Sequence, residues 1–347
     1  MPVTKLNIAD FLELKCRAPL LDVRSPGEFA HAHIPGALSL PLFNDEERAT
    51  IGTAYKQESR EQAIRIGLAS FGKNMVGLVD EVEKILSARA GNNREIGVHC
   101  WRGGMRSAAV AWLLDLYGFK VYVLSGGYKA YRNWVLQQFE KNRRFHIVGG
   151  FTGSNKTGTL LELRQQGEPV IDLEGLAGHK GSAFGNLDRG QQPAQEMFEN
   201  LLAGELSRHD ADQPIWIEDE SQRIGSINIP HALFNTIRSQ GFLFLDIPFG
   251  QRLQHILAGY GKHDKEKYIN AIIRITKRLG GLETKQAVNC LLEDDVKGCF
   301  TILLNYYDKI YLRNRLNRKE AEHTPLTCPT THAKSNSQQL IRHVRNT

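Results

Sequence analysis

A single cysteine stands in a stretch whose residue types favour thiol chemistry, His99-Cys-Trp-Arg-Gly-Gly-Met-Arg-Ser107. The stretch follows an apolar run and opens a helical one, so backbone N–H groups and the positive helix end should point at the sulfur. Such a setting lowers the pKa of a cysteine below its usual value of about 8.5. Arginines add positive charge, and glycines let the backbone fold closely around the sulfur. The predicted catalytic residue is Cys100, and the predicted loop residues are Arg102, Gly103, Gly104 and Arg106.

The loop also suits a cysteine that carries an extra chalcogen atom, because a persulfide or perselenide is anionic and needs several donors. The alternative is a buried structural cysteine at the end of a strand. Two arginines and two glycines in the next six residues argue against that alternative. The other four cysteines are scattered, form no CxxC pair and predict neither a disulfide framework nor a metal site; they are Cys16, Cys290, Cys299 and Cys328.

A second stretch resembles a phosphate-binding loop, Gly150-Phe-Thr-Gly-Ser-Asn-Lys-Thr157. It follows an apolar run and precedes a helical stretch, which is the context such a loop requires. Its N–H groups would surround phosphate oxygens, with a lysine as a point charge and a threonine hydroxyl for Mg²⁺. Asn155 stands where the motif has its second glycine, and asparagine tolerates a left-handed backbone best among the other residues. The predicted phosphate-binding residues are Gly150, Gly153, Ser154, Asn155, Lys156 and Thr157.

The altered glycine position leaves a second interpretation of this loop open, namely a degenerate loop that is only structural. Carboxylates at the ends of neighbouring strands are its expected acidic partners, although they could equally be helix caps or solvated turns. The candidates are Asp172, Glu174, Glu218 and Asp219. No metal-ligand cluster is predicted.

Short apolar runs alternate with helical patterns along the chain, which predicts parallel sheets covered by helices in an α/β fold. The predicted strands are 20–23, 96–99, 120–124, 146–148, 170–173, 215–217 and 242–245, and the predicted helices are 61–88, 105–117, 195–208 and 232–238. Residues 252–319 read as helical and highly charged. We predict one domain over 1–140, a second over 141–320 with a helical C-terminal part, and a disordered basic tail over 321–347.

The 347 residues carry a formal net charge of +6, which favours a polyanionic partner,. No apolar run approaches the roughly 20 residues of a membrane-spanning helix, and the first ten residues have no signal-peptide core. We therefore expect a cytoplasmic protein that does not associate with membranes. The oligomeric state is not predicted.

Residues 10–137 resemble a rhodanese domain. The resemblance rests on Leu21–Phe29, on His31–Ala37, on Ser125–Tyr128 and on the position of Cys100. It implies a parallel-sheet domain in which hydrogen bonds of four side chains hold the scaffold together without a catalytic role; these are Asp22, Arg24, Glu28 and His33.

The chain from about residue 10 to about residue 315 resembles the tRNA 2-selenouridine synthases, which join a rhodanese-like domain to a phosphate-loop domain. The motifs are Asp172–Gly185, Glu218–Gly225, Asp246–Phe249, Tyr306–Asp308 and the cysteine loop. The resemblance implies geranylation of 2-thiouridine at position 34 of the tRNAs for Lys, Glu and Gln by geranyl diphosphate. Selenium from selenophosphate then displaces the geranylthio group, and Cys100 would hold it as a perselenide.

The resemblance implies no tightly bound cofactor, and the phosphate loop would take either the prenyl diphosphate, with Mg²⁺, or ATP. In the glycine-rich part of Asp172–Gly185, the residues that could contact the phosphate donor or the target base are His179, Lys180, Ser182 and Phe184. The candidate tRNA-backbone contacts are Arg223, Arg252 and the run Lys262–Arg278. Two other functions stay open. One is a general sulfurtransferase acting through Cys100, and the other is a non-catalytic protein that binds tRNA or a nucleotide.

Overall fold

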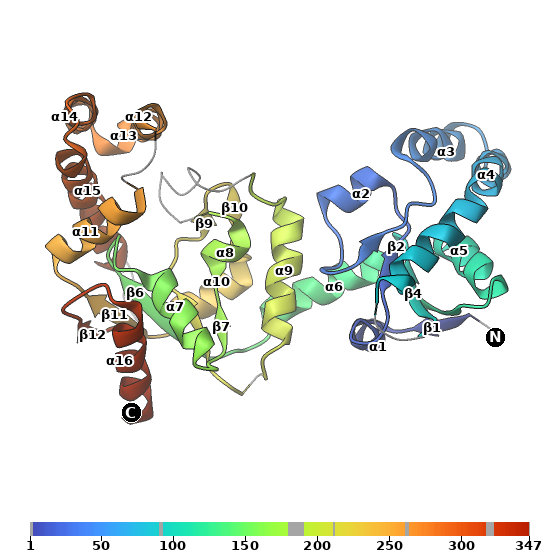
Figure 1. The fold of residues 1–347 in the computed structure, drawn as a ribbon, viewed down its shortest axis with the longest axis horizontal. Coiled ribbons are helices and arrows are strands. Elements are labelled where there is room, and N and C mark those ends of the chain that lie inside the picture. The colour runs from blue at the N-terminus through green and yellow to red at the C-terminus, as the bar shows by residue number, and fades with distance from the viewer. Residues whose placement is uncertain are drawn as a thin grey trace. The chain divides into compact units, whose positions relative to one another are not determined.

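The computed structural model describes residues 3–89, 93–179, 191–210, 212–260, 264–316 and 323–346. The chain divides into two compact units, which we call the N-terminal unit (Met1–Gln138) and the C-terminal unit (Phe139–Thr347). Their ribbons are drawn in Figure 1. None of the described helices combines the length and apolar character needed to cross a bilayer.

Five parallel strands form the sheet of the N-terminal unit, in the order β1-β5-β4-β2-β3. The strands are β1 (Thr4–Leu6), β2 (Leu20–Asp22), β3 (Leu38–Ser39), β4 (Glu95–His99) and β5 (Lys120–Leu124). The connecting helices are α1 (Ile8–Leu14), α2 (Pro26–His31), α3 (Asp45–Gln57), α4 (Arg60–Ser87), α5 (Met105–Leu116) and α6 (Gly127–Glu140). The strands β2, β4 and β5 are nearly continuous buried runs, as strands covered on both faces require,.

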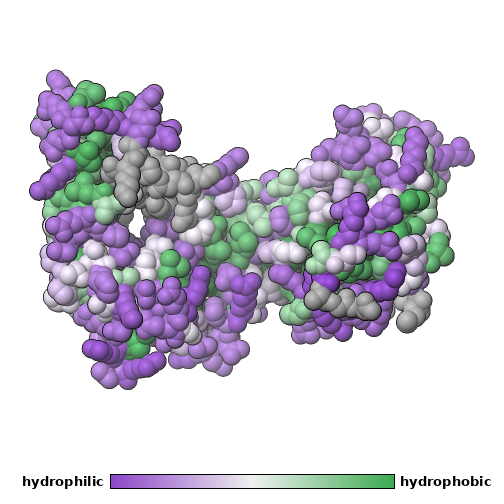
Figure 2. All heavy atoms as spheres, in the orientation of Figure 1, coloured by the Kyte–Doolittle hydropathy of each residue, from purple (hydrophilic) through white to green (hydrophobic). Residues whose placement is uncertain are grey.

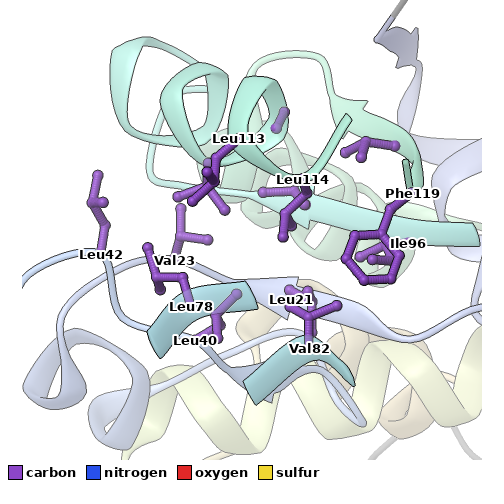
Figure 3. Packing of buried hydrophobic residues seen from close by; sticks show 14 of the residues in the cluster. Leu21, Val23, Leu40, Leu42, Leu78, Val82, Ile96, Leu113, Leu114 and Phe119 are labelled. Atoms are coloured by element: carbon purple, nitrogen blue, oxygen red, sulfur yellow. The ribbon is translucent and has the colours of Figure 1, made fainter. Parts of the chain in front are cut away.

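A hydrophobic core of the N-terminal unit lies between this sheet and two of its helices, α4 and α5 (Figure 3). Leu21 of β2 and Ile96 of β4 pack in one cluster with Val82 of α4 and Leu114 of α5, and all four are fully buried. Each such side chain contributes about 1.5–3 kcal/mol relative to an exposed one. Because β4 and α5 both belong to this core, the loop that joins them, which contains Cys100, is held at both ends.

The C-terminal unit has its own sheet of five parallel strands, in the order β12-β11-β6-β8-β7. These are β6 (Phe145–Gly150), β7 (Val170–Ile171), β8 (Ile215–Glu218), β11 (Phe242–Asp246) and β12 (His323–Thr327), and β9 (Arg223–Ile224) pairs with β10 (Ile227–Asn228) in a separate antiparallel ribbon. The helices that accompany the sheet are α7 (Lys156–Gln165), α8 (Leu173–Ala177), α9 (Gln195–Ser207), α10 (His231–Arg238) and α16 (Ala333–Asn346).

The predicted helical part forms a cluster with its own apolar core. It contains α11 (Phe249–Tyr260), α12 (Lys265–Arg274), α13 (Thr276–Leu279), α14 (Gly281–Leu292) and α15 (Val296–Leu316). The visible surface of both units is largely hydrophilic (Figure 2). The α/β fold class predicted for both halves is confirmed.

The position of β6 explains where a ligand of the C-terminal unit would bind. It is the central strand, flanked by β11 and β8. In open parallel sheets ligands bind beyond the carboxyl ends of the strands. The loop after β6 and the carboxylates at the end of β8 therefore share one edge of the sheet.

The prediction of a disordered tail over 321–347 is wrong for the residues that the structure describes there. β12 extends the sheet by pairing in parallel with β11. Leu326, Cys328 and Leu340 are buried in the same core as Val148 and Trp216. The polar composition of the segment concealed this role, because only a few apolar residues on one face of α16 are needed to cover the sheet.

Candidate functional site

Cys100 lies directly after β4, in the turn that leads into α5, and it is 3% exposed. A second turn packs against its backbone, since the Tyr128 N–H donates to the Cys100 carbonyl at 2.8 Å. Gly103 has φ +66°, and a Cβ there would lie 2.6 Å from the Leu124 carbonyl oxygen. Gly127 has φ +58°, and its Cβ would lie 2.4 Å from the Cys100 carbonyl oxygen. Glycine is therefore required on both sides of this contact.

Gly104 differs from Gly103, because a Cβ at Gly104 would meet nothing within 4 Å. It stands at the N-cap of α5 and has a negative φ. Its carbonyl accepts a hydrogen bond from the Ser107 hydroxyl at 3.1 Å. Gly104 thus contributes backbone groups to the loop, whereas the predicted close approach of the chain occurs at Gly103.

The sulfur of Cys100 has a local set of hydrogen-bond donors. Burial raises the pKa of this thiol, but the Ser107 hydroxyl and the N–H groups of Ser107, Arg102 and Gly104 outweigh burial, so that the pKa lies below its usual value,. The Ser107 Oγ lies 3.2 Å from the sulfur. The thiolate form of Cys100 is therefore favoured by hydrogen bonding, as expected for a cysteine at a helix N-terminus,.

The two arginines of the loop have different surroundings. Arg106 donates to Glu28 at 2.8 Å. Burial raises the pKa of the Glu28 carboxyl group, but Arg106, the Ser25 N–H and Arg48 together lower it below its usual value. Arg102 is exposed. The prediction that both guanidinium groups serve the sulfur therefore needs correction for Arg106, whose charge pairs with Glu28.

The predicted scaffold role of four side chains is confirmed by their hydrogen bonds. Arg24 is 2% exposed and binds Asp22 with an Nη2–Oδ2 distance of 2.6 Å. The same Nη2 donates to the Ala32 carbonyl at 2.7 Å. Glu28 holds Arg106, as described above, and the His33 Nδ1 lies 2.9 Å from the Phe29 carbonyl. These contacts fix the segment that precedes β3 beside the cysteine loop.

The phosphate-like loop runs from the end of β6 to the start of α7. Asn155 has φ +57° and ψ +40°, so the left-handed conformation expected at this position is confirmed. Its amide donates to the Thr331 carbonyl at 2.9 Å. Gly153 has φ +83°, and a Cβ there would lie 2.8 Å from Ile256. The loop keeps the backbone of its motif, and the asparagine also links it to the turn between β12 and α16.

The polar side chains of the loop point in different directions. The Lys156 ammonium donates to the Gly150 carbonyl at 3.1 Å, so it folds back over the loop. The Thr157 hydroxyl donates to Glu174 at 2.9 Å. Ser154 is 1% exposed and donates to the Phe151 carbonyl at 2.6 Å. Lys156 and Ser154 thus bond to carbonyl groups of the loop itself, whereas Thr157 connects the loop to Glu174 of α8.

Of the four predicted acidic partners, Glu174 contacts the loop, through Thr157. Asp172 caps α8 by accepting from the Gly175 N–H at 2.7 Å. Glu218 is fully buried and accepts from the Leu173 N–H at 2.9 Å. Burial and the neighbouring carboxylates raise its pKa well above the usual range. Asp219 pairs with Arg238 at 3.2 Å.

Two functional candidates were not singled out from the sequence. Burial and the charge of Glu174 raise the pKa of Glu220 to about 7, although Lys156 opposes the shift. The Tyr311 hydroxyl accepts from the Gly150 N–H at 3.3 Å and donates to Asp219 at 2.9 Å. Glu220 lies two residues after the end of β8, and this position next to a strand end was a usable signal. Tyr311 is 161 positions from Gly150 in the chain, so no local pattern in the sequence indicated this contact.

The predicted tRNA contacts differ in their exposure to solvent. Arg252 is 3% exposed and binds Asp308 through two hydrogen bonds of 2.9 and 2.8 Å and the Thr152 carbonyl through a third. It therefore supports the phosphate-like loop, and its prediction as a tRNA contact is wrong. Arg223 is exposed. His179 is buried, and its neighbours Lys180, Ser182 and Phe184 lie outside the described residues.

The run predicted over Lys262–Arg278 begins in α12 at Lys265, and residues 261–263 lie outside the described part of the chain. Among the described residues, no three His, Cys, Asp or Glu side chains are grouped as metal ligands.

In comparison with known proteins, each half of the chain matches a protein family. Residues 8–133 match the rhodanese-like domain family, and residues 143–326 match the family described as tRNA 2-selenouridine synthase AAA domain. The tRNA 2-selenouridine synthase of Bdellovibrio bacteriovorus is 34% identical over 343 residues, which cover 85% of this chain and 88% of that protein. The enzyme of the same name from Marinobacter nauticus is 33% identical, with 90% and 92% covered. That from Nitrosomonas europaea is 36% identical, with 74% and 66% covered.

Proposed function

Because the chain belongs to the tRNA 2-selenouridine synthase family, we propose that it is a tRNA-modifying transferase that replaces the sulfur of 2-thiouridine with selenium. The observation that carries this proposal is the thiol of Cys100, which is buried at a strand end, lies in hydrogen-bond contact with Ser107 and has a pKa below its usual value. The target is the uridine at wobble position 34. Selenium is attached at carbon 2 of the base, and Cys100 is the residue that holds it beforehand.

The first step of the proposed reaction is geranylation of the 2-thio group. Sulfur bound to carbon 2 is a poor leaving group, and alkylation turns it into a geranylthiolate that can depart. The donor is geranyl diphosphate, whose diphosphate would bind the loop between β6 and α7. Lys156 supports this assignment, because its ammonium can neutralise the charge that develops on the departing oxygens. ATP is the competing ligand for the same loop.

A magnesium ion could accompany the diphosphate, and the residues present fit one. Mg²⁺ in phosphate sites takes one or two carboxylates together with phosphate oxygens and water. Thr157 and Glu174 lie in hydrogen-bond contact and would supply two oxygen ligands. The ion would neutralise charge on the diphosphate. Lys156 and the loop N–H groups would bind and orient the same diphosphate.

In the second step the Cys100 thiolate attacks the selenium of selenophosphate, the Se–P bond breaks, and phosphite leaves with its electron pair, which gives the perselenide. The terminal selenium then attacks carbon 2 of the geranylated base, and geranylthiolate departs. Two equivalents of an external thiol reduce the remaining Se–S bond, which releases 2-selenouridine and restores Cys100.

Selenophosphate is the proposed source of the selenium. The N–H groups of Arg102, Gly104 and Ser107 that stabilise the thiolate of Cys100 would also stabilise an anionic perselenide. We propose the tRNAs for Lys, Glu and Gln as substrates. Exposed basic side chains such as Arg102 are suited to the RNA backbone, so affinity should fall steeply with salt concentration,.

Reconstitution tests this function. The purified chain is incubated with tRNA that contains 2-thiouridine, geranyl diphosphate, selenophosphate and a thiol reductant, and the nucleosides are identified by mass spectrometry. Formation of 2-selenouridine supports the proposal. Lys156→Ala should prevent formation of both the geranylated and the selenylated nucleoside. If ATP binds the loop and geranyl diphosphate does not compete with it, the loop assignment is wrong.

A further inference from the structure

An exposed tryptophan directly follows the buried nucleophile. Trp101 is 37% exposed, whereas Cys100 is 3% exposed. The backbone of Trp101 is fixed, because its carbonyl accepts from the Lys129 N–H at 2.9 Å. Its ring lies 5.7 Å from that of Tyr128, which is fully buried. The indole is therefore held against Tyr128 at the surface, on the residue that follows Cys100.

Two exposed cations accompany this indole. Arg102 is the next residue in the chain, and Lys129 is the residue whose N–H binds the Trp101 carbonyl. Both side chains are exposed. An aromatic platform with cations beside it is the arrangement by which proteins bind single-stranded nucleic acid, since bases stack on the ring and phosphates contact the cations.

We propose that the indole of Trp101 stacks on the wobble base of the tRNA, with Arg102 and Lys129 on the adjacent phosphates. The inference rests on the proposed function, because that function brings an RNA base to Cys100. Bases of an anticodon loop are unpaired and can be turned out of the loop, which a stacking platform requires. Because Trp101 is the residue next to Cys100, a base stacked on its indole has carbon 2 close to the selenium that Cys100 holds.

Binding of an RNA stem-loop tests the proposal without any turnover. The probe is a fluorescein-labelled anticodon stem-loop with 2-thiouridine at the wobble position, and the readout is fluorescence anisotropy. Trp101→Ala should raise Kd roughly 5- to 150-fold, the range for loss of one stacked base. Trp101→Phe should restore most of the affinity. Trp112→Ala is the matched control, since Trp112 is also exposed, on α5, and should leave Kd unchanged.

A second RNA that lacks only the wobble base separates stacking from a structural effect. On this RNA the wild type and Trp101→Ala should bind equally well. The proposal is overturned if the wild type does not bind the first RNA, if Trp101→Ala binds it like wild type, or if the variant loses as much affinity for the second RNA. It is also overturned if Trp101→Ala slows alkylation of Cys100, since the indole would then shape the loop. Failure of the proposed function would give a different result. In that case no 2-selenouridine forms, but the RNA still binds and its affinity still depends on Trp101.

Discussion

The Ser107 hydroxyl oxygen lies 3.2 Å from the Cys100 sulfur and 3.1 Å from the Gly104 carbonyl oxygen. A hydroxyl has one proton, so it can donate to only one of these two acceptors at a time. With a thiol at Cys100, the S–H donates to Ser107, and Ser107 donates to Gly104. With a thiolate, the hydroxyl can turn to donate to the sulfur. Ser107 therefore accommodates both protonation states of the nucleophile.

Replacing this serine should make the nucleophile less acidic. Ser107→Ala removes a donor to the thiolate, so the pKa of Cys100 rises and the thiolate fraction at a given pH falls. A hydrogen bond to a charged group contributes about 1.5–3 kcal/mol, which corresponds to about one to two pH units. The pH profile of alkylation by iodoacetamide should move upward by that amount. Ser87→Ala on α4 is the control, and an unmoved profile for Ser107→Ala would show that Ser107 does not act on the sulfur.

The backbone of the phosphate-like loop predicts an unusual order of stability among Asn155 variants. Alanine pays about 1–2 kcal/mol for a left-handed conformation and also loses the bond to Thr331,. Glycine loses the bond but adopts the conformation freely. In urea denaturation of variants in which Trp101, Trp112 and Trp134 are replaced by Phe, so that the fluorescence is that of the buried Trp216, Asn155→Ala should lose about 2 kcal/mol and Asn155→Gly less than about 1 kcal/mol,. Equal losses would contradict the role of the backbone.

Much of this architecture follows from local patterns in the sequence. Short, mostly apolar runs such as those in Leu20–Asp22 and Lys120–Leu124 are typical of strands covered on both faces,. The places where such runs end identified the loop of Cys100 and the loop of Lys156. The left-handed conformation of Asn155 was predictable because it stands at a glycine position of its motif.

Partners that are distant in the chain were not predictable. Arg106 reads as a cation for the nearby sulfur, yet its partner Glu28 is 78 positions away. Arg252 reads as an RNA contact, but packing encloses it with Asp308. No local pattern specifies such pairs, because they depend on how whole elements pack against one another.

The C-terminal helix α16 should contribute as much to the free energy of unfolding as a helix from the middle of the chain. Leu340 of α16 is fully buried in the core that contains Val148 and Trp216. Leu340→Ala should cost about 2–5 kcal/mol of unfolding free energy, as large-to-small changes in cores do. The exposed Leu292 provides the control, and Leu292→Ala should stay within about 0.5 kcal/mol of wild type,. Comparable stabilities of the two variants would mean that α16 is not part of the folded core.

The carboxyl group of Glu220 predicts a pH-dependent affinity for the diphosphate. Its pKa is about 7, so it is mostly neutral at pH 6 and mostly charged at pH 8. The charged form repels an anion bound near Lys156. Because diphosphate itself titrates, the informative quantity is the ratio of the Kd of wild type to that of Glu220→Gln for geranyl diphosphate. This ratio should be near one at pH 6 and rise to roughly tenfold at pH 8, about 1.4 kcal/mol. A ratio that does not change with pH would exclude this effect of Glu220.

The most direct test of the proposed role of Cys100 uses a variant that cannot hold selenium. Cys100→Ser and wild type are each incubated with 2-thiouridine tRNA, geranyl diphosphate and selenophosphate, and the nucleosides are measured by mass spectrometry. Cys16→Ser, which changes an exposed cysteine, is the control. We expect 2-selenouridine with wild type and with Cys16→Ser, and S-geranyl-2-thiouridine alone with Cys100→Ser. Formation of 2-selenouridine by Cys100→Ser at the wild-type rate would contradict the assignment of Cys100.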